Sequence, residues 1–131
     1  MTNTTADDVI QSFESSFADK KVIPKELEIM WLKKAVGRYC LEIESIEFDE
    51  LTLMFSQPLQ QYIIDTLALF MKQSYQERET SLVNKRVSIV SKDFSIDGNN
   101  GSKTAAANEL NYIKEEAAVL VAKQQTPSYA N

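Results

Sequence analysis

The hydrophobic positions near the N-terminus recur with helical spacing. Val9, Phe13 and Phe17 follow one another at intervals of four residues, which places them on one face of a helix. Thr5 precedes Asp8 by three positions, as in a capping box, where each side chain bonds to the backbone of the other residue. The pair of lysines that follows suits the negative end of the helix dipole. The pattern predicts a short amphipathic helix.

A second and wider hydrophobic stripe follows. Pro24 suits the first turn of a helix. Gly37, inside the stripe, lowers helix stability by about 1 kcal/mol relative to alanine, so we expect another backbone to pack closely there. The width of the stripe predicts a well-buried helix. Its hydrophobic members are Leu27, Trp31, Ala35 and Tyr39, with Leu32, Val36, Cys40 and Ile43 beside them.

The middle of the chain alternates and then becomes strongly apolar. The stretch IEFDELTLMF alternates hydrophobic and polar residues, which predicts a loop or small hairpin with Asp49 and Glu50 at its turn. Neither residue readily takes a positive φ, so Asp-Glu is a poor two-residue turn. Pro58 opens the longest predicted helix, which runs to about Lys85. Its first half is apolar on nearly every side and should form the centre of the core.

The C-terminal part is expected to be a strand, a glycine-rich connection and a last helix. FSID alternates like a strand, Gly98 and Gly101 break it, and Ser102 caps a helix that runs to about Gln124. We therefore predict a helical core domain at residues 1–97 and an arm at residues 98–131, made of a hinge, the last helix and a tail. The helix has a narrow apolar seam that either binds a partner or packs on its own domain. The seam residues are Ala106, Leu110, Ile113, Ala117 and Leu120.

The segment GNNGSKT resembles a nucleotide-binding loop, but the spacing of its glycines and lysine does not match that motif. Such a loop needs glycine, four residues and then Gly-Lys-Ser/Thr. Here the position five residues before Gly101 is Ile96, and Ser102 separates Gly101 from Lys103. A turn and a helix cap explain the segment better.

Composition narrows the function further. The chain has 131 residues, 44% of them hydrophobic and 25% charged, as expected for one globular domain. It has no histidine and one cysteine, Cys40, which removes the usual general base, the usual metal ligands and any internal disulfide. We therefore predict no catalytic, cofactor-binding or metal-binding residues, and we interpret Cys40 as a buried core thiol and Asp65 as a hydrogen-bonded structural carboxylate. The apolar run at residues 62–71 is too short to span a bilayer, and no secretory signal is recognisable at the N-terminus, so we expect synthesis in the cytosol.

Charge is unevenly distributed along the chain. The net charge is 14 − 19 = −5, which argues against a broad DNA-binding face. Six basic and two acidic residues lie between Lys20 and Arg38, whereas residues 39–71 contain six acidic residues and no basic one. The segregation is either ordinary solvated surface or a contact in which the basic region of one subunit meets the acidic region of the next. The candidate contact residues are Lys33, Lys34, Arg38, Glu44, Glu47, Asp49 and Glu50.

A helix-turn-helix is also excluded, because the connection between the second and third helices is far longer than the roughly three or four residues of that motif. Three segments, IMWLKKAVGRYCLEIE, QYIIDTLALFMKQSYQERE and SKDFSID, follow one another along the chain. These segments and their order resemble the head-tail connector proteins of tailed bacteriophages, also called adaptor or head completion proteins. A glycine expected before the aspartate of SKDFSID is absent.

The resemblance implies a structural virion protein at the junction of capsid and tail, made in the bacterial cytoplasm. It implies a ring of about twelve copies under the portal protein, a next neck, stopper or tail-terminator protein as partner, and double-stranded DNA passing through without sequence-specific binding. The C-terminal arm would reach the portal, and its candidate contacts are Lys103, Leu110, Tyr112, Ile113, Leu120, Pro127 and Tyr129. The alternative is a small cytosolic helical module for protein binding or regulation, either a monomer or a homodimer. An enzyme using Asp65 or Lys103 is the least favoured class.

Overall fold

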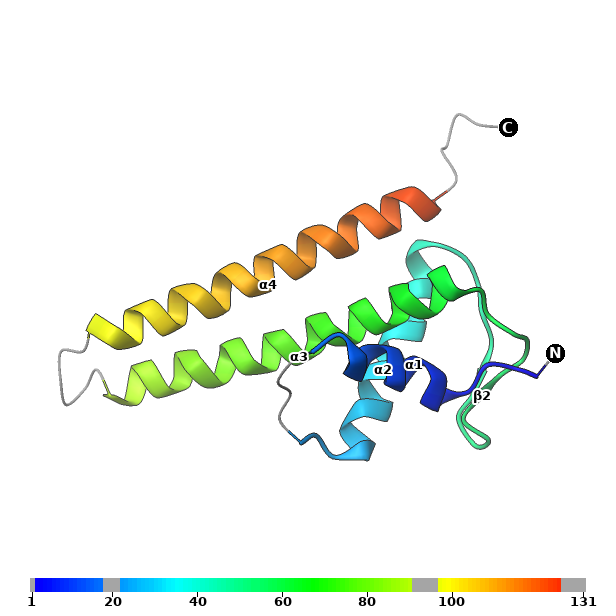
Figure 1. Cartoon of the computed structure of the whole chain (residues 1–131), viewed down its shortest axis with the longest axis horizontal. Helices are drawn as coiled ribbons and strands as arrows, with labels where there is room; N and C mark the ends of the chain where they lie inside the picture. Colours follow the sequence, from blue (N-terminus) through cyan, green and yellow to red (C-terminus); the bar gives the residue numbers. More distant parts are fainter. Residues whose placement is uncertain (1, 18–21, 91–96, 126–131) are drawn as a thin grey trace.

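Two long antiparallel helices form the axis of the molecule. The structure, a computed structural model, describes residues 2–17, 22–90 and 97–125, with residues 86–90 and 97–103 described by their backbone alone. Helices α3 (Gln61–Val90) and α4 (Asp97–Gln124) lie side by side, while α1 (Ala6–Ser15) and α2 (Lys25–Glu42) pack on the N-terminal half of α3 (Figure 1). Strands β1 (Phe48–Asp49) and β2 (Met54–Phe55) form a small antiparallel hairpin. The predicted fold class, a small mainly helical bundle with a short hairpin, is confirmed.

Helix α1 begins with the predicted capping box. The Thr5 backbone N–H donates to Asp8 Oδ2 at 2.9 Å, and the Asp8 N–H donates to Thr5 Oγ1 at 3.3 Å. Val9 and Phe13 are fully buried. The predicted short amphipathic helix is therefore present, and it ends at Ser15.

Helix α2 buries the predicted stripe, but its glycine does not behave as expected. Trp31, Ala35 and Tyr39 are buried. A Cβ atom placed on Gly37 would meet nothing within 4 Å, so the expectation of close backbone packing there is wrong within the described chain. Gly37 instead lies on the open side of the helix.

The hairpin is joined by the N-terminal segment. Phe48 pairs with Phe55 and Asp49 with Met54, and Thr5 forms an antiparallel bridge to Met54. The turn spans residues 50–53 rather than Asp49 and Glu50. Leu53 adopts a φ of 57°. The left-handed conformation in the turn is therefore at Leu53 and not at Asp49 or Glu50.

The helix boundaries around the predicted hinge differ from expectation. Helix α3 begins at Gln61 instead of Pro58 and continues to Val90 instead of ending near Lys85. Of the predicted FSID strand, residues 94–96 lie outside the described residues, and Asp97 is the first residue of α4. Helix α4 begins at Asp97, so Gly98 and Gly101 lie inside a helix and Ser102 is not its cap.

The core is built by all four helices. Phe13, Phe17, Trp31 and Tyr75 meet edge to face, with ring centroids 4.9–6.3 Å apart. Such pairs stabilise a core beyond the burial of their area. The first half of α3 supplies Leu67 and Met71, both fully buried, as predicted. From α4, the buried residues are Ile113, Ala117 and Val121, so its seam packs on its own chain.

A buried polar network fixes the end of α4. Gln124 Oε1 accepts from the Tyr39 hydroxyl at 2.9 Å, and its Nε2 donates to Thr66 Oγ1 at 2.7 Å and to the Leu120 carbonyl at 3.1 Å. Thr66 in turn donates to the Tyr62 carbonyl at 2.7 Å. The network joins α2, α3 and α4 through one glutamine side chain. The predicted boundary between residues 97 and 98 therefore falls in the first turn of α4, a helix that shares a core with α2 and α3.

Candidate functional site

The predicted basic contact residues differ in how far their own chain engages them. Arg38 Nε donates to Glu42 at 2.8 Å, its Nη1 donates to Gln73 Oε1 at 2.9 Å, and its guanidinium lies 4.1 Å from the centre of the Phe70 ring. Lys33 approaches Glu50 at 3.6 Å. Lys34 is exposed and has no ion pair among the described residues. Lys34 is therefore the most available of the three cations.

The predicted acidic residues lie on the segment that follows α2. Glu44 is exposed, and its charge, together with the larger effect of burial, raises the pKa of Tyr39 to about 12. Asp49 Oδ1 accepts from the backbone N–H groups of Leu51 at 2.8 Å and Thr52 at 3.4 Å, an Asx turn that shapes the hairpin loop. Asp49 therefore has a local structural role.

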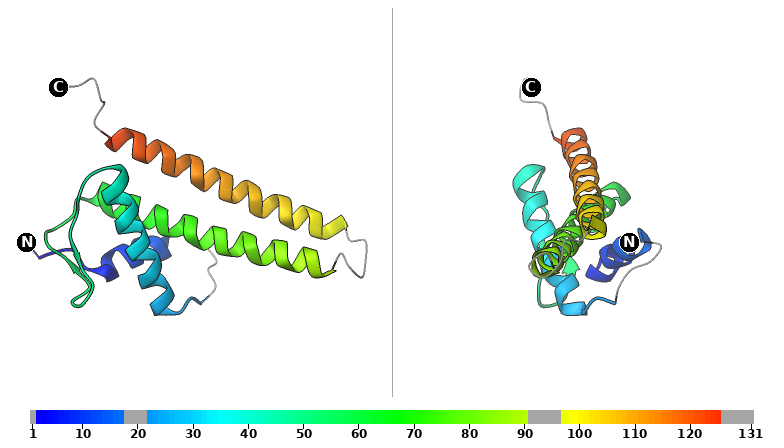
Figure 2. Two further views of the ribbon diagram at one scale, coloured as in Figure 1. Left: turned by 180° about the vertical axis from the view of Figure 1, so that it is seen from behind. Right: turned by 90° about the vertical axis from the view of Figure 1, so that its left-hand side faces the viewer.

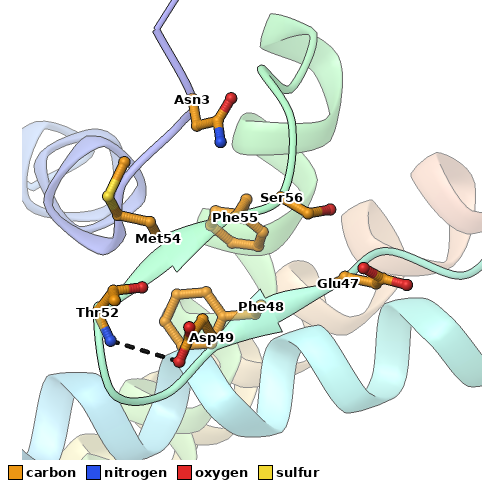
Figure 3. Close-up of a pocket in the computed structure, with 8 residues that line it drawn as sticks. All are labelled: Asn3, Glu47, Phe48, Asp49, Thr52, Met54, Phe55 and Ser56. Atoms are coloured by element: carbon orange, nitrogen blue, oxygen red, sulfur yellow. Dashed lines mark hydrogen bonds between the residues drawn. The ribbon is translucent and has the colours of Figure 1, made fainter.

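A shallow depression of about 400 Å³ lies at the hairpin. Figure 3 shows Asn3 and Met54 on one side of it and Phe48 and Asp49 on the other. The Phe48 and Phe55 rings pack with their centroids 4.8 Å apart. Its lining contains two carboxylates, Glu47 and Asp49, and two hydroxyls, Thr52 and Ser56. The lining residues are Asn3, Glu47, Phe48, Asp49, Thr52, Met54, Phe55 and Ser56.

A second cleft, of about 310 Å³, lies between α1 and α3 and contains Asp65. Asp65 Oδ1 accepts from Gln61 Nε2 at 2.9 Å and from Ser12 Oγ at 3.3 Å. The predicted hydrogen bonding of Asp65 is confirmed, although its side chain is exposed and not in the core. Lys72, also in the cleft, has its Nζ 5.3 Å from the centre of the Phe17 ring. A serine bonded to an exposed carboxylate, with no imidazole to take its proton, is a weak nucleophile.

The chain's thiol and its acidic residues also give no metal site in the described residues. Cys40 is half-buried, and its Sγ donates to the Ile46 carbonyl at 3.3 Å and accepts from the Ile46 N–H at 3.4 Å. Within the described ranges, no group of three or more acidic or cysteine side chains could hold a metal ion.

Among the described residues, no helix is both long and apolar enough to cross a membrane.

The residues predicted to bind the portal fall into three groups. Ile113 is buried in the core of its own chain, and Leu110 and Leu120 are half-buried. Tyr112 is 59% exposed. Lys103 lies in α4 but its side chain is outside the described set, as are Pro127 and Tyr129. Among the candidates whose side chains are described, Tyr112 is the one that α4 presents outward most fully.

Tyr112 belongs to an apolar depression on the outer face of α4. The depression measures about 380 Å³ and is lined by Tyr112, Glu115, Glu116, Val119 and Leu120. Val119 is 51% exposed. A hydrogen bond to the Glu116 carboxylate raises the pKa of Tyr112. This face combines apolar side chains with negative charge.

Two of the most exposed apolar residues were not identified as surface residues from the sequence. Leu51 was assigned to the predicted hairpin and Leu41 to no stripe, and they are 95% and 87% exposed. The α2 stripe offered a clue for Leu41, because Trp31, Ala35 and Tyr39 define a direction that Leu41 does not share. Leu51 carried no comparable clue, since its exposure depends on the shape of the turn.

Comparison with known proteins found no relatives. No protein-family model matches the chain, and no match was found among curated proteins or solved structures.

Proposed function

We propose that this chain is a structural subunit of the head-tail connector of a tailed bacteriophage, located in the virion at the junction of capsid and tail. The observation that carries the proposal is the exposure of large apolar side chains on three separate elements. They are Leu41 on α2, Leu51 at the hairpin tip, and Tyr112 and Val119 on α4, all between 51% and 95% exposed. Apolar surface on several sides of a small protein is typical of a subunit with several neighbours. The order of segments described above supports the same class.

Assembly accounts for the chemistry of the molecule better than catalysis does. The hairpin depression and the cleft between α1 and α3 contain hydroxyl, amide and carboxylate groups and one lysine, with no activated nucleophile among the described residues. Their polar groups bond to one another, as in the contacts of Asp65 with Gln61 and Ser12. We therefore assign the chain a binding role and no enzymatic one.

The net negative charge of the chain is compatible with a subunit that lines a channel for DNA. A net charge of −5 gives few cations that would hold the phosphates of passing DNA, since each phosphate contact with Lys or Arg strengthens sequence-independent binding. In this role the chain forms a ring of about twelve copies, contacts the portal on one side and contacts the next neck or tail protein on the other.

The test is the sedimentation mass of the purified protein with and without the portal protein encoded beside it. We expect a discrete complex containing about twelve copies per portal ring. Truncation after Gln125 removes the tail that includes Pro127 and Tyr129 while leaving the core contacts of α4 in place. Loss of portal binding in this variant, with unchanged helicity, would assign the contact to the tail.

Tyr112→Ala tests the outer face of α4 in the same assay, and Lys85→Ala on α3 is its exposed control. A folded monomer or dimer that ignores the portal would overturn the connector proposal. That outcome would favour the alternative, a small helical module for protein binding or regulation.

A further inference from the structure

The outer face of α2 has the properties of a docking surface for a helix. Met30, Gly37 and Leu41 are spaced by seven and four residues, so they share one stripe on the side opposite Trp31 and Ala35. Met30 is 55% exposed and Leu41 87%, and the space above Gly37 is open. An exposed helical glycine lowers stability by about 1 kcal/mol relative to alanine, and no contact within the described chain compensates for it. Its one structural advantage is that another backbone can approach closely.

The margin of this stripe is basic. Lys33 and Lys34 lie on either side of the line from Met30 to Gly37. The pair of Lys33 with Glu50 is exposed on both sides, at 41% and 65% of the side chains, so water screens it and its contribution is small. Both lysines can therefore serve a partner, and the partner that fits them is an apolar surface with acidic residues along its edge.

The outer face of α4 has that chemistry. Tyr112 and Val119, seven residues apart, form its exposed apolar line. Glu109, Glu115 and Glu116 lie beside this line, and the exposed Lys123 continues it one turn beyond Val119. The two helix faces are thus similar in their exposed apolar centres, and the charges that directly flank those centres are opposite.

The two faces also point to different sides of the molecule. Glu116, beside the Tyr112 line, borders the cleft that contains Ser12 and Lys72, so this face of α4 is turned toward α1. Figure 2 shows α1 and α2 on either side of α3 in the end-on view, with α4 above them. A single chain cannot join these faces to each other, but a second copy can.

We propose that the outer face of α2 in one copy binds the outer face of α4 in the next, with Gly37 admitting the close approach of the two helices. The contact joins two different surfaces, so it is heterologous and propagates into a ring or an open chain instead of stopping at a two-fold dimer. It rests on the proposed function in one respect, that copies of this chain assemble, and it adds which surfaces meet. Arg38 has no part in it, because its own chain engages it.

Cross-linking tests the geometry directly. In a Cys40→Ala background, cysteines are placed on both faces as Leu41→Cys and Val119→Cys, which leaves Gly37 unchanged, and the protein is treated with a short bismaleimide. Leu41 is 87% exposed and Val119 51% exposed, so neither change disturbs the core. We expect a ladder of dimers, trimers and higher species from the double-cysteine chain. The two single-cysteine chains are the matched controls and should give little cross-linked product.

Two results would overturn the proposal. Dimers from either single-cysteine chain, as abundant as those from the double-cysteine chain, would show that like faces meet about a two-fold axis. Absence of a ladder both in the free protein and in the presence of the portal protein would show that these faces do not meet at all.

Charge exchange provides an independent measurement on the free protein. Lys34→Glu and Glu115→Lys should each weaken self-association by about tenfold, because each places like charges together. Combining both changes in one chain should restore most of the association. Lys85→Glu, a charge reversal on α3 away from both faces, is the control. Equal weakening by the control, or no recovery in the double variant, would contradict the proposal.

The outcome is separate from that of the portal experiment. A chain that forms the predicted ladder but ignores the portal would leave this contact standing while removing the connector function. A chain that binds the portal but forms no ladder would leave the connector function standing while removing this contact.

Discussion

Gln124 illustrates how one side chain connects three helices. Its amide accepts from Tyr39 on α2 and donates to Thr66 on α3. Both partners are fully buried, so neither can replace the lost bond with water. A buried polar group left without its partner destabilises a protein by about 1–3 kcal/mol.

Gln124→Leu should therefore lower the free energy of unfolding by about 1–3 kcal/mol, measured by urea denaturation. The neighbouring change Lys123→Leu, at an exposed position, is the matched control and should have little effect. If the two variants lose the same stability, the network does not fix α4 to the core.

Tyr39 makes the stability of the fold sensitive to alkaline pH. Burial raises its pKa from 10.0 to about 12, with a smaller effect from the Glu44 charge. Above about pH 10 the unfolded chain releases the phenolic proton while the folded chain retains it, so the stabilising effect is complete below pH 10 and is lost as the pH rises toward 12. We expect the free energy of unfolding to fall by about 1–2 kcal/mol over this range.

The measurement is a series of urea midpoints between about pH 9 and about pH 11.5. Lys25, whose pKa is raised by its hydrogen bond with Asp7, changes stability in the same direction, so the wild type alone does not isolate the tyrosine. Tyr39→Phe should be less stable at pH 9 but should show a shallower decline, and the difference between the two slopes measures Tyr39. Parallel slopes would contradict the assignment.

At the scale of elements, the hairpin depends on one strained residue. Leu53 has a φ of 57°, which a residue with a Cβ adopts at a cost of about 1–2 kcal/mol. It is held there by contacts at both ends of its backbone. The Leu53 N–H donates to the Asp49 carbonyl and its carbonyl accepts from Ala6, each at 2.8 Å, while its half-buried side chain packs on the core.

Substitution of Leu53 by glycine should be less destabilising than substitution by alanine, which is the reverse of the usual order of these two residues. Leu53→Ala removes packing and retains the strain, whereas Leu53→Gly removes packing and relieves it. We expect the glycine variant to be more stable than the alanine variant by about 1 kcal/mol, measured by thermal or urea unfolding. An alanine variant that is the more stable of the two would mean that the loop leaves the left-handed conformation when the leucine is removed.

The elements also show where sequence reasoning succeeds and where it fails. The Thr5–Asp8 capping box and the Trp31, Ala35 and Tyr39 stripe were predictable because each depends on residues within one or a few turns. The helical start of α4 at Asp97 was not, since Gly98 and Gly101 individually favour a break. Packing of the helix on α3 provides a stabilisation that local propensity does not contain.

The candidate surface residues could likewise be predicted only where their availability depends on the local sequence. The charge segregation around Lys34 was visible in the sequence, whereas the engagement of Arg38 by Phe70 and Gln73 needed contacts across 32 and 35 positions of the chain. The depression along Tyr112 and Val119 was also missed, because only the packing of Ile113 and Ala117 shows which side of α4 faces outward. Long-range packing therefore decides which residues are available to a partner.

At the scale of the whole molecule, α4 decides whether the chain is one unit or a core with an arm. Ile113 and Ala117 are buried to 1% and 0% exposure against the other helices, and Gln125 Nε2 donates to the Glu42 carbonyl at the end of α2 at 2.9 Å. Removing α4 would uncover the apolar side of α3 and leave the Tyr39 hydroxyl without its partner. Lost burial of this kind destabilises by about 25 cal/mol per Å² of apolar surface, and a domain this small has only about 5–15 kcal/mol of stability.

A fragment of residues 1–96 should therefore fail to unfold cooperatively in urea and should bind a hydrophobic dye, while truncation after Gln125 should retain a sharp transition. Circular dichroism and dye fluorescence on the two truncated proteins make the comparison. A cooperative transition in the shorter fragment would establish residues 1–97 as an independent domain with α4 as a separable arm. Loss of cooperativity would mean that any contact of α4 with a neighbouring protein is made by its outer face while its inner face stays on its own core.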